Sequence, residues 1–344
     1  MKLLEKIKAG VYAVAEMSAN HNGDFDRALA IARASKDAGA DCLKIQTYTA
    51  DSITIDCDGP LFMIEGGLWD GYRLYDLYKN ASTPYGWQPT IKEECDRLGL
   101  DFLSTPFDKD GADFLESLGV EAYKVASFEL VDIPLIRHIA KKGKPMIVSC
   151  GMGTADEIGE AVDAMLAEGL PKDMVVLLKC TSEYPASADD LNLLTIPDME
   201  RRFGVAVGLS DHTLGCAAPV AAAALGARVV EKHFCLSRAD GGVDSAFSME
   251  PDEFRDMVGC LGVAGRARGR VRYGATGREE GSLVFRRSVF AVQDIEAGEA
   301  FTAQNIRVIR PGQGVAPKHY GSLLGRHSRQ AYRRGMPIAR AEIE

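Results

Sequence analysis

One pattern repeats along this chain and restricts the folds open to it. A helical segment ends at a glycine, a short apolar run follows, and a polar residue stands at the far end of that run. DAGADCLKIQT has Gly39 before Lys44, and SLGVEAYKVAS has Gly119 before Lys124. Glycine suits the left-handed backbone that closes a helix, and a continuous apolar run is typical of a strand buried on both faces. The pattern therefore predicts alternating helices and parallel strands.

Eight strands of this kind can be counted over roughly the first 260 residues. They are VYAVAE, DCLKIQT, DFLSTP (101–106), AYKVAS, PMIVSCG (145–151), MVVLLKCTS (174–182), VAVGLSDH (205–212) and RVVEKHF. Eight alternating β/α units favour a TIM (β/α)8 barrel. An open doubly wound sheet is the rival fold, but no Gly-x-Gly-x-x-Gly fingerprint follows a strand. We therefore expect an α/β protein built on a TIM barrel.

Two segments depart from this repeat. Residues 48–88 form a connection too long for an ordinary βα loop, and they are rich in aromatic side chains. They predict either a lid over the strand ends or a helical insertion that packs its own aromatics. After a barrel domain at 1–269, the basic, glycine-containing stretch 270–285 is typical of a linker. Residues 286–344 hold short strand-like runs between glycine turns, which predicts a small, mostly β module.

Composition narrows the class of protein. The net charge of −9 argues against a nucleic-acid partner or an anionic membrane surface. No apolar run of 18 residues is present to span a membrane. The eight cysteines form no Cys-x-x-Cys pair, and several lie in apolar strands. We therefore expect a protein of the reducing cytoplasm, without a disulfide framework or a zinc finger.

The polar residues of this chain stand where a TIM barrel places its active site, at the carboxyl ends of the strands. Period-two alternation puts Lys44 and Gln46 on one face of their strand, and Glu231 and His233 on one face of theirs. By the same alternation Lys232 points away, towards the helices or the rim. We therefore expect the first four of these side chains to meet at the barrel mouth.

Two histidines follow neighbouring strands. His212 and His233 stand at adjacent strand ends, within reach of one divalent cation. A pair of imidazoles that leaves positions open suits Mn²⁺, Zn²⁺ or Fe²⁺. The spacing is no local metal motif, so hydrogen-bonded catalytic or structural histidines are the alternative.

Two lysines and several hydroxyls ring the same mouth. The lysines are Lys44 and Lys124, and the hydroxyls are those of Thr105, Ser127 and Ser149. Together they predict a cradle for a phosphate or carboxylate group. A Schiff-base aldolase is the other functional interpretation, because a desolvated lysine can act as a nucleophile.

Four carboxylates complete this constellation. They are Glu16, Glu129, Glu231 and Asp244. Each can bind sugar hydroxyls or transfer protons, and simple pairing with a lysine is the alternative for each. The stretch AEMSANHNGDF, which holds Glu16, predicts a polar first βα loop that faces the substrate. A turn that caps the next helix is the alternative for Asn22 and Asp24.

Motifs along essentially the whole chain resemble the sialic acid synthase family. In order they are EMSANHNG, DCLKIQTYT, STPFD, AYKVASFE, LLKCTSEYP, VGLSDHT, EKHF and DGGVDSAFS. EMSANHN, LYDLYKNASTPY and RADGGVDSAFSMEP are most similar to the pseudaminic acid branch of that family. Residues 286–344, with FRRS, AGE and IRPGQG, resemble the family's antifreeze-like (SAF) domain.

The resemblance implies a reaction. Family members condense phosphoenolpyruvate with an open-chain amino sugar to give a nine-carbon nonulosonic acid and phosphate. In the pseudaminic branch the sugar is 2,4-diacetamido-2,4,6-trideoxy-L-altrose, whereas legionaminate and N-acetylneuraminate synthases take other sugars. From different classes, a Schiff-base lyase and a non-catalytic carbohydrate-binding protein remain open.

The resemblance also implies roles for individual residues. His212 and His233 match metal ligands, with Mn²⁺ or Mg²⁺ as the expected cofactor. The positions that match phosphoenolpyruvate contacts are Lys44, Thr105, Lys124, Ser127, Ser149, Ser182 and Ser210. Expected contacts with the sugar or the metal-bound water are Asn20, Gln46 and Tyr184, and the expected catalytic carboxylates are Glu16, Glu129 and Asp244. Arg310 matches an arginine that the SAF domain extends into the partner's active site, which implies a domain-swapped homodimer.

Overall fold

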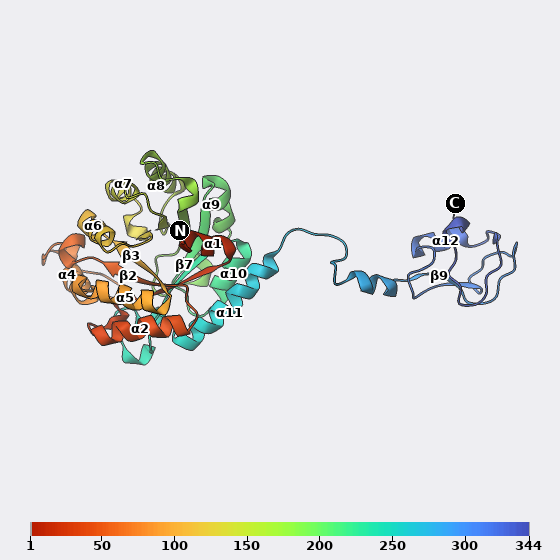
Figure 1. Cartoon of the computed structure of the whole chain (residues 1–344), viewed down its shortest axis with the longest axis horizontal. Coiled ribbons are helices and arrows are strands. Elements are labelled where there is room, and N and C mark those ends of the chain that lie inside the picture. Colours follow the sequence, from red (N-terminus) through yellow and green to blue (C-terminus); the bar gives the residue numbers. More distant parts are fainter. Residues whose placement is uncertain (1, 344) are drawn as a thin grey trace. The chain divides into compact units, whose positions relative to one another are not determined.

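The structure is a computed structural model that describes residues 2–343, and the chain divides into two compact units between Gly269 and Arg270. Within that range, eight strands of the first unit form one sheet in the order β3-β2-β1-β8-β7-β6-β5-β4, and contacts between β3 and β4 close the ring. Paired strands run parallel (Figure 1). The predicted TIM-type barrel is therefore confirmed.

Each strand coincides with one of the apolar runs of the sequence. The strands are β1 (Tyr12–Glu16), β2 (Cys42–Thr47), β3 (Asp101–Pro106), β4 (Tyr123–Val125), β5 (Met146–Ser149), β6 (Val175–Cys180), β7 (Ala206–Asp211) and β8 (Val229–His233). Nearly all of their residues are buried. This agrees with strands covered on the outside by helices and on the inside by the barrel core.

Helices connect the strands and surround the ring (Figure 1). They are α2 (Phe25–Asp37), α3 (Ala50–Ile53), α4 (Leu74–Ala81), α5 (Gln88–Leu98), α6 (Lys109–Ser117), α7 (Ile133–Ala140), α8 (Ala155–Ala167), α9 (Thr195–Phe203), α10 (Ala217–Leu225) and α11 (Pro251–Arg268). α2 illustrates how they form: the Asp24 side chain accepts a hydrogen bond from Arg27 N, which caps the helix, and Ala28, Ile31 and Ala32 bury one face.

The amino-terminal end of the barrel is closed by a helix that the sequence analysis did not predict. α1 (Lys2–Ala9) packs Leu3, Leu4 and Ile7 against the residues that fill the barrel interior. Lys6 Nζ lies 2.7 Å from Asp101 Oδ2, and the Tyr12 hydroxyl donates to the same oxygen. α1 is therefore held by an apolar face and one partly exposed ion pair.

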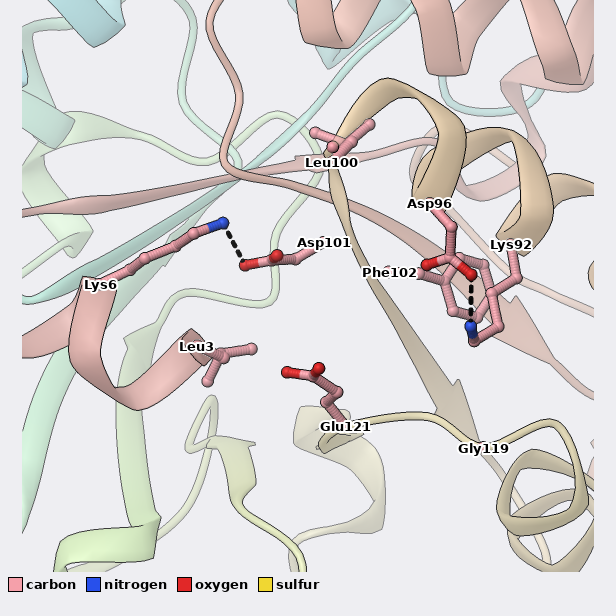
Figure 2. A pocket seen from close by; sticks show the side chains of 10 residues that line it. Leu3, Lys6, Lys92, Asp96, Leu100, Asp101, Phe102, Gly119 and Glu121 are labelled. Atoms are coloured by element: carbon pink, nitrogen blue, oxygen red, sulfur yellow. Dashed lines mark hydrogen bonds and ion pairs between the residues drawn. The ribbon is translucent and has the colours of Figure 1, made fainter. Parts of the chain in front are cut away.

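A cavity of about 370 Å³ lies beside α1 (Figure 2). Its lining includes Leu3, Lys6, Asp101 and Glu121. Asp101 begins β3, so this cavity opens at the amino ends of the strands. It lies at the opposite end of the barrel from the polar residues that the sequence predicts to be functional.

The long connection after β2 combines the two predicted alternatives. It contains α3 and α4, and some of its aromatic rings pack on the barrel: Trp87 contacts His21 and Phe25, and Tyr85 contacts Phe114. Trp69 instead contacts Tyr184, which follows β6. Helical packing and a lid-like element therefore coexist in this segment.

The second unit has its own core. β9 (Ser288–Ala291) and β10 (Ile306–Ile309) pair antiparallel, and α12 (Tyr320–Leu323) packs Leu323 into the same cluster as Val289 and Phe301. In the stretch predicted to be a linker, residues 280–285 form a short 3-10 helix. Within residues 2–343, none of the helices has the length and apolar composition needed to cross a bilayer.

Candidate active site at the barrel mouth

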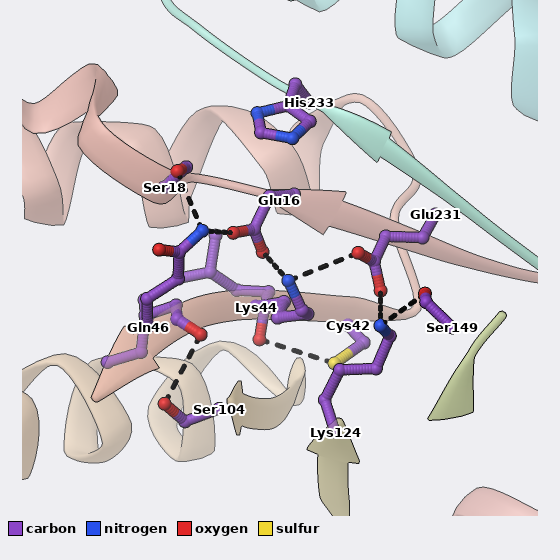
Figure 3. A network of polar contacts seen from close by, with 12 residues as sticks. Glu16, Ser18, Cys42, Lys44, Gln46, Ser104, Lys124, Ser149, Glu231 and His233 are labelled. Atoms are coloured by element: carbon purple, nitrogen blue, oxygen red, sulfur yellow. Dashed lines mark hydrogen bonds and ion pairs between the residues drawn. The ribbon is translucent and has the colours of Figure 1, made fainter. Parts of the chain in front are cut away.

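Side chains from five strands meet at the carboxyl ends of the barrel strands (Figure 3). They are Glu16 of β1, Lys44 and Gln46 of β2, Lys124 of β4, Ser149 of β5, and Glu231 and His233 of β8. Strand register explains the convergence, because Glu16 lies beside both Lys44 and His233 in the sheet. The alternation read from the sequence thus brings these side chains to one place.

Four buried charges form the centre of the site. Lys44 Nζ lies 2.6 Å from Glu16 Oε2 and 3.1 Å from Glu231 Oε1. Lys124 Nζ lies 3.8 Å from Glu231 Oε2 and donates to Ser149 Oγ at 2.6 Å. All four charged side chains are at most 7% exposed. Buried charges are tolerated only when they are paired and hydrogen-bonded, and here two carboxylates balance two ammonium groups.

The two carboxyl groups of this cluster differ in proton affinity. Burial raises the pKa of Glu16, although Lys44 opposes the shift. Burial acts in the same direction on Glu231, but the charges of Lys124 and Lys44 outweigh it and lower the pKa of that carboxyl. Glu231 is therefore held as an anion between the lysines, whereas Glu16 protonates more readily. Such divergent pairs suit acid–base chemistry.

His212 and His233 lie together, with ring centroids 5.4 Å apart. His212 Nδ1 lies 2.8 Å from the Thr181 carbonyl oxygen, which places the proton on Nδ1 and leaves the lone pair of Nε2 free to bind a cation. His233 Nδ1 is buried without a hydrogen-bond partner in the described chain and lies 3.9 Å from Asp244 Oδ2. Burial, followed by the neighbouring cationic groups, lowers the pKa of His233, which favours the neutral imidazole.

These donors fit a metal ion held by two imidazoles. The described residues contain no group of three or more His, Cys, Asp or Glu arranged around one metal position. A cation held by two imidazoles alone would keep positions open for other ligands, as catalytic sites do. The unpartnered Nδ1 of His233 supports this fit, because a buried polar atom without a partner is costly.

Several of the hydroxyls for which the sequence predicts an anion cradle lie near Lys124 and Gly151. The Gly151 N–H donates to Ser127 Oγ at 3.0 Å, and a Cβ on Gly151 would stand 2.3 Å from Ser182 Oγ. Glycine is therefore required where these hydroxyls approach the backbone. Thr105 Oγ1 is buried and has no partner among residues 2–343, so it can hydrogen-bond to a ligand. On the far side of the ring, Ser210 of β7 lies beside Glu231.

Two further carboxyl groups border the mouth. Burial raises the pKa of Glu129, which follows β4, to about 7, and its Oε2 has no hydrogen-bond partner within the described residues. Asp244, which follows β8, accepts a hydrogen bond from Ala19 N at 3.4 Å, and burial raises the pKa of its carboxyl. Gln46 Nε2 donates to Glu16 Oε1 and to Ser18 Oγ. These contacts orient the side chains for which the sequence predicts sugar contacts or catalysis.

The first βα loop is held largely by its own polar side chains. Asn20 Nδ2 donates to Phe234 O and Ser248 Oγ, and Asn22 Nδ2 donates to Gly241 O. His21 accepts from Gly23 N through Nδ1. The bonds of Asn20 and Asn22 tie the loop to the segment after β8, a contact that the sequence did not predict. The sugar contact expected of Asn20 stays a prediction, for which its Oδ1 is the remaining atom.

Aromatic rings surround the two histidines. Tyr184, which follows β6, lies 4.3 Å from His212 between ring centroids, and Phe247 lies 4.8 Å from His233. Tyr184 and Phe247 also contact each other. These rings give this part of the site apolar walls, and electrostatic interactions are stronger in apolar surroundings than in water. The sequence motifs pointed to Tyr184 but gave no indication of Phe247.

A second buried ion pair lies just outside the lumen. Lys232 Nζ lies 2.5 Å from Asp211 Oδ2, both side chains are fully buried, and Lys232 also donates to the Thr213 carbonyl. Alternation correctly directed Lys232 away from the mouth. It could not reveal Asp211 as its partner, although both residues alternate onto the outer face of neighbouring strands. The pair joins the peptides that carry His212 and His233.

Arg310 belongs to the second unit, one residue beyond β10, and its side chain is exposed. Its expected role in a partner's active site stays a prediction.

Comparisons with known proteins divide the chain near the boundary between its two compact units. The NeuB family model matches residues 31–273, and the SAF domain model matches residues 286–344. The chain is 42% identical to the pseudaminic acid synthase of Campylobacter jejuni over 334 residues, which is 97% of each protein. It is 33% identical to the N,N'-diacetyllegionaminic acid synthase of Legionella pneumophila, covering 91% of this chain and 89% of that protein.

A solved structure agrees with these sequence matches. The N-acetylneuraminic acid synthetase of Leptospira borgpetersenii, in complex with citrate, superimposes with a TM-score of 0.71 at 28% identity, covering 80% of this chain and 90% of that one. The family match extends over more than half of the chain and includes all the strands from β2 to β8. The chain therefore belongs to the NeuB family, the sialic acid synthases, and carries a SAF domain after its barrel.

Proposed function

We propose that this chain condenses phosphoenolpyruvate with 2,4-diacetamido-2,4,6-trideoxy-L-altrose and water, giving pseudaminic acid and phosphate. The observation that carries the proposal is the near full-length similarity to the Campylobacter jejuni pseudaminic acid synthase. The buried cluster of Glu16, Lys44, Lys124 and Glu231 supplies the charges that the reaction requires. The lower identity to the legionaminic acid synthase favours the altro sugar over its legionaminic counterpart.

Phosphoenolpyruvate is the anionic substrate in this proposal. Lys124 and Lys44 bind its phosphate and carboxylate, and the hydroxyls of Ser127, Ser149, Ser182, Ser210 and Thr105 complete the cradle. The hydrogen bond from Lys124 to Ser149 and the unpartnered Thr105 hydroxyl support this assignment. Lysines that are already paired with Glu231 need little reorganisation when the anion binds.

The sugar aldehyde is the electrophile. His212 and His233 would hold a divalent cation, Mn²⁺ or Mg²⁺, which when bound supplies Lewis-acid polarisation of that aldehyde and a template for the reactants. Asn20, Gln46, Tyr184 and Asp244 border the space beside the histidines and are the proposed sugar contacts.

Carboxyl groups of the chain donate and accept the protons that the reaction transfers. Carbon 3 of phosphoenolpyruvate attacks the aldehyde carbon, and positive charge develops at carbon 2. Water adds at carbon 2 and loses a proton, and cleavage of the bond between carbon 2 and the phosphate oxygen then releases phosphate. Glu129, with a pKa of about 7, can accept the proton of the water. Glu16 or Asp244, whose pKa values are raised by burial, can donate one to the aldehyde oxygen.

Ion pairing disfavours the Schiff-base lyase. A nucleophilic lysine must lose its proton, whereas Glu16 and Glu231 raise the pKa of Lys44 despite its burial. Burial lowers the pKa of Lys124, but Glu231 and Ser149 hold its ammonium group. Cleavage of a C–O bond requires no covalent lysine.

The proposal extends to assembly and location. Arg310 would enter the partner's barrel mouth in a domain-swapped homodimer, supported by the match of residues 286–344 to the SAF domain. The protein would act in the cytoplasm. Cysteines that form no disulfide in the described chain support that location.

Phosphate release from phosphoenolpyruvate tests the function. The assay compares the altro sugar, its legionaminic counterpart and N-acetylmannosamine, each with Mn²⁺ and again after treatment with EDTA. Release with the altro sugar, lost with EDTA, is expected. A preference for another sugar would keep the reaction and overturn the substrate. Borohydride trapping of pyruvate on the protein, with no phosphate release, would replace the synthase with the lyase.

A further inference from the structure

A short arm projects from the connection between β2 and α4. Residues 63–73 form it: Met63 and Arg73 pair as an antiparallel bridge, Ile64 N donates to the Tyr72 carbonyl oxygen, and Gly71 N donates to the Ile64 carbonyl oxygen. Arg73 fixes the base of the arm through ion pairs with Asp56, Asp58 and Asp76. The arm is therefore anchored at its base and turns at Trp69 near its tip.

Trp69 reaches across the barrel mouth. The arm follows β2, whereas Tyr184 follows β6, and β2 and β6 are four strands apart in either direction around the ring of eight. Nevertheless the rings of Trp69 and Tyr184 lie 5.5 Å apart between centroids. Loops on opposite sides of a barrel can meet in this way only above its mouth, so the arm bridges the opening.

The tip of the arm is also fixed to the segment after β8. Trp69 Nε1 donates to the carbonyl oxygen of Val243 at 3.2 Å, and Val243 precedes Asp244. The indole thus contacts one residue that stacks on His212 and another that adjoins the carboxyl beside His233. Both neighbours, Tyr184 and the segment that carries Asp244, belong to the proposed sugar contacts.

We propose that Trp69 is the lid residue of the sugar subsite and forms its apolar wall. This inference rests on the proposed function. An acetamido-deoxy sugar carries methyl groups on its acetamido and deoxy positions, and an indole face covers such groups well because aromatic rings bury a large apolar area. Glycines 66, 67 and 71 have positive φ, and because glycine changes backbone conformation at little steric cost, they are the proposed hinges on which the tip lifts to admit the sugar.

Steady-state kinetics with variants of the arm test the lid. Trp69→Ala should raise the KM for the sugar roughly tenfold or more, because an aromatic wall is lost, while the KM for phosphoenolpyruvate stays within about twofold. Tyr72→Ala is the matched control, since Tyr72 lies on the same arm and is 51% exposed. It should change neither constant by more than about twofold. Trp69→Phe should recover most of the affinity for the sugar.

Fluorescence gives a readout that does not depend on turnover. The chain has two tryptophans, so Trp87→Phe leaves Trp69 as the reporter. In that variant, adding the altro sugar should shift the emission and protect the indole from acrylamide, whereas phosphoenolpyruvate alone should do neither.

The possible outcomes distinguish a failure of the lid proposal from a failure of the proposed function. Turnover in the wild type, with equal sugar constants in Trp69→Ala and Tyr72→Ala, would overturn the lid and leave the proposed function standing. Unchanged Trp69 fluorescence at saturating sugar would do the same. If the wild type releases no phosphate with any of the three sugars, the proposed function fails, and this inference fails with it.

Discussion

The two ends of the barrel are built from the same eight strands but bury different chemistry. At the amino end, Leu3, Leu4 and Ile7 of α1 cover an apolar interior, with one partly exposed ion pair at the rim. At the carboxyl end, the lumen holds four paired charges, two histidines and several polar atoms without partners in the described chain. The apolar amino end stabilises the fold, whereas the carboxyl end keeps polar atoms without hydrogen-bond partners in the described chain, which a ligand can bind. Substitutions at the two ends should therefore separate stability from activity.

The largest effect is expected at the carboxyl end. His233→Ala should lower kcat/KM by on the order of a thousandfold, as the loss of a central electrostatic group does. The same variant should abolish binding of Mn²⁺ measured by calorimetry. Its free energy of unfolding should change by about 1 kcal/mol or less, because the Nδ1 atom has no hydrogen bond to lose. Activity retained in this variant would remove the metal assignment.

The reverse result is expected at the amino end. Ile7→Ala should lower the free energy of unfolding by about 2–5 kcal/mol, because a buried side chain leaves a cavity. Denaturant titration measures this change, and kcat/KM should stay within about twofold after correction for the folded fraction. Val263→Ala, at a residue that is 57% exposed, is the matched control and should be close to neutral. A large loss of activity in folded Ile7→Ala protein would couple the two ends and break the comparison.

The third expected effect is a dependence of the reaction rate on pH, caused by a carboxyl group at the barrel mouth. Burial raises the pKa of Glu129 to about 7, so its carboxyl is mostly protonated below neutral pH and ionised above it. If Glu129 accepts the proton of water, the rate should rise with pH through about 7. Glu129→Gln should lower kcat by about a hundredfold and remove that limb from the profile. A limb that persists in the variant would assign the proton transfer to another carboxyl group.

The sequence correctly predicted those features that depend on the local order of residue types. Strand positions followed from apolar runs, and the charges at the mouth followed from period-two alternation, because parallel strands align their carboxyl ends. Lys44 and Glu231, which are distant in sequence, were brought to one lumen by that reasoning alone.

Features that depend on the path of the chain could not be anticipated in this way. α1 is too short for its propensity to define it, and it is held by packing on the barrel interior. The pairing of Lys232 with Asp211 and the contact of Trp69 with Tyr184 join different strands and loops, and neither has a spacing that a sequence pattern can register. In each case the missing information was the three-dimensional neighbour of a residue, and only for Lys232 did the sequence indicate in which direction its side chain points.

The smallest effect is expected for Lys6. Its side chain is partly exposed, and Asp101 would still accept the hydrogen bond of the Tyr12 hydroxyl if Lys6 were lost. Lys6→Met should therefore change the free energy of unfolding by less than about 1 kcal/mol, as is usual for exposed pairs. Denaturant titrations at low and high salt measure the change, which should shrink further as salt screens the pair. A loss comparable with that of Ile7→Ala would mean that the ion pair, and not the apolar face of α1, closes the amino end of the barrel.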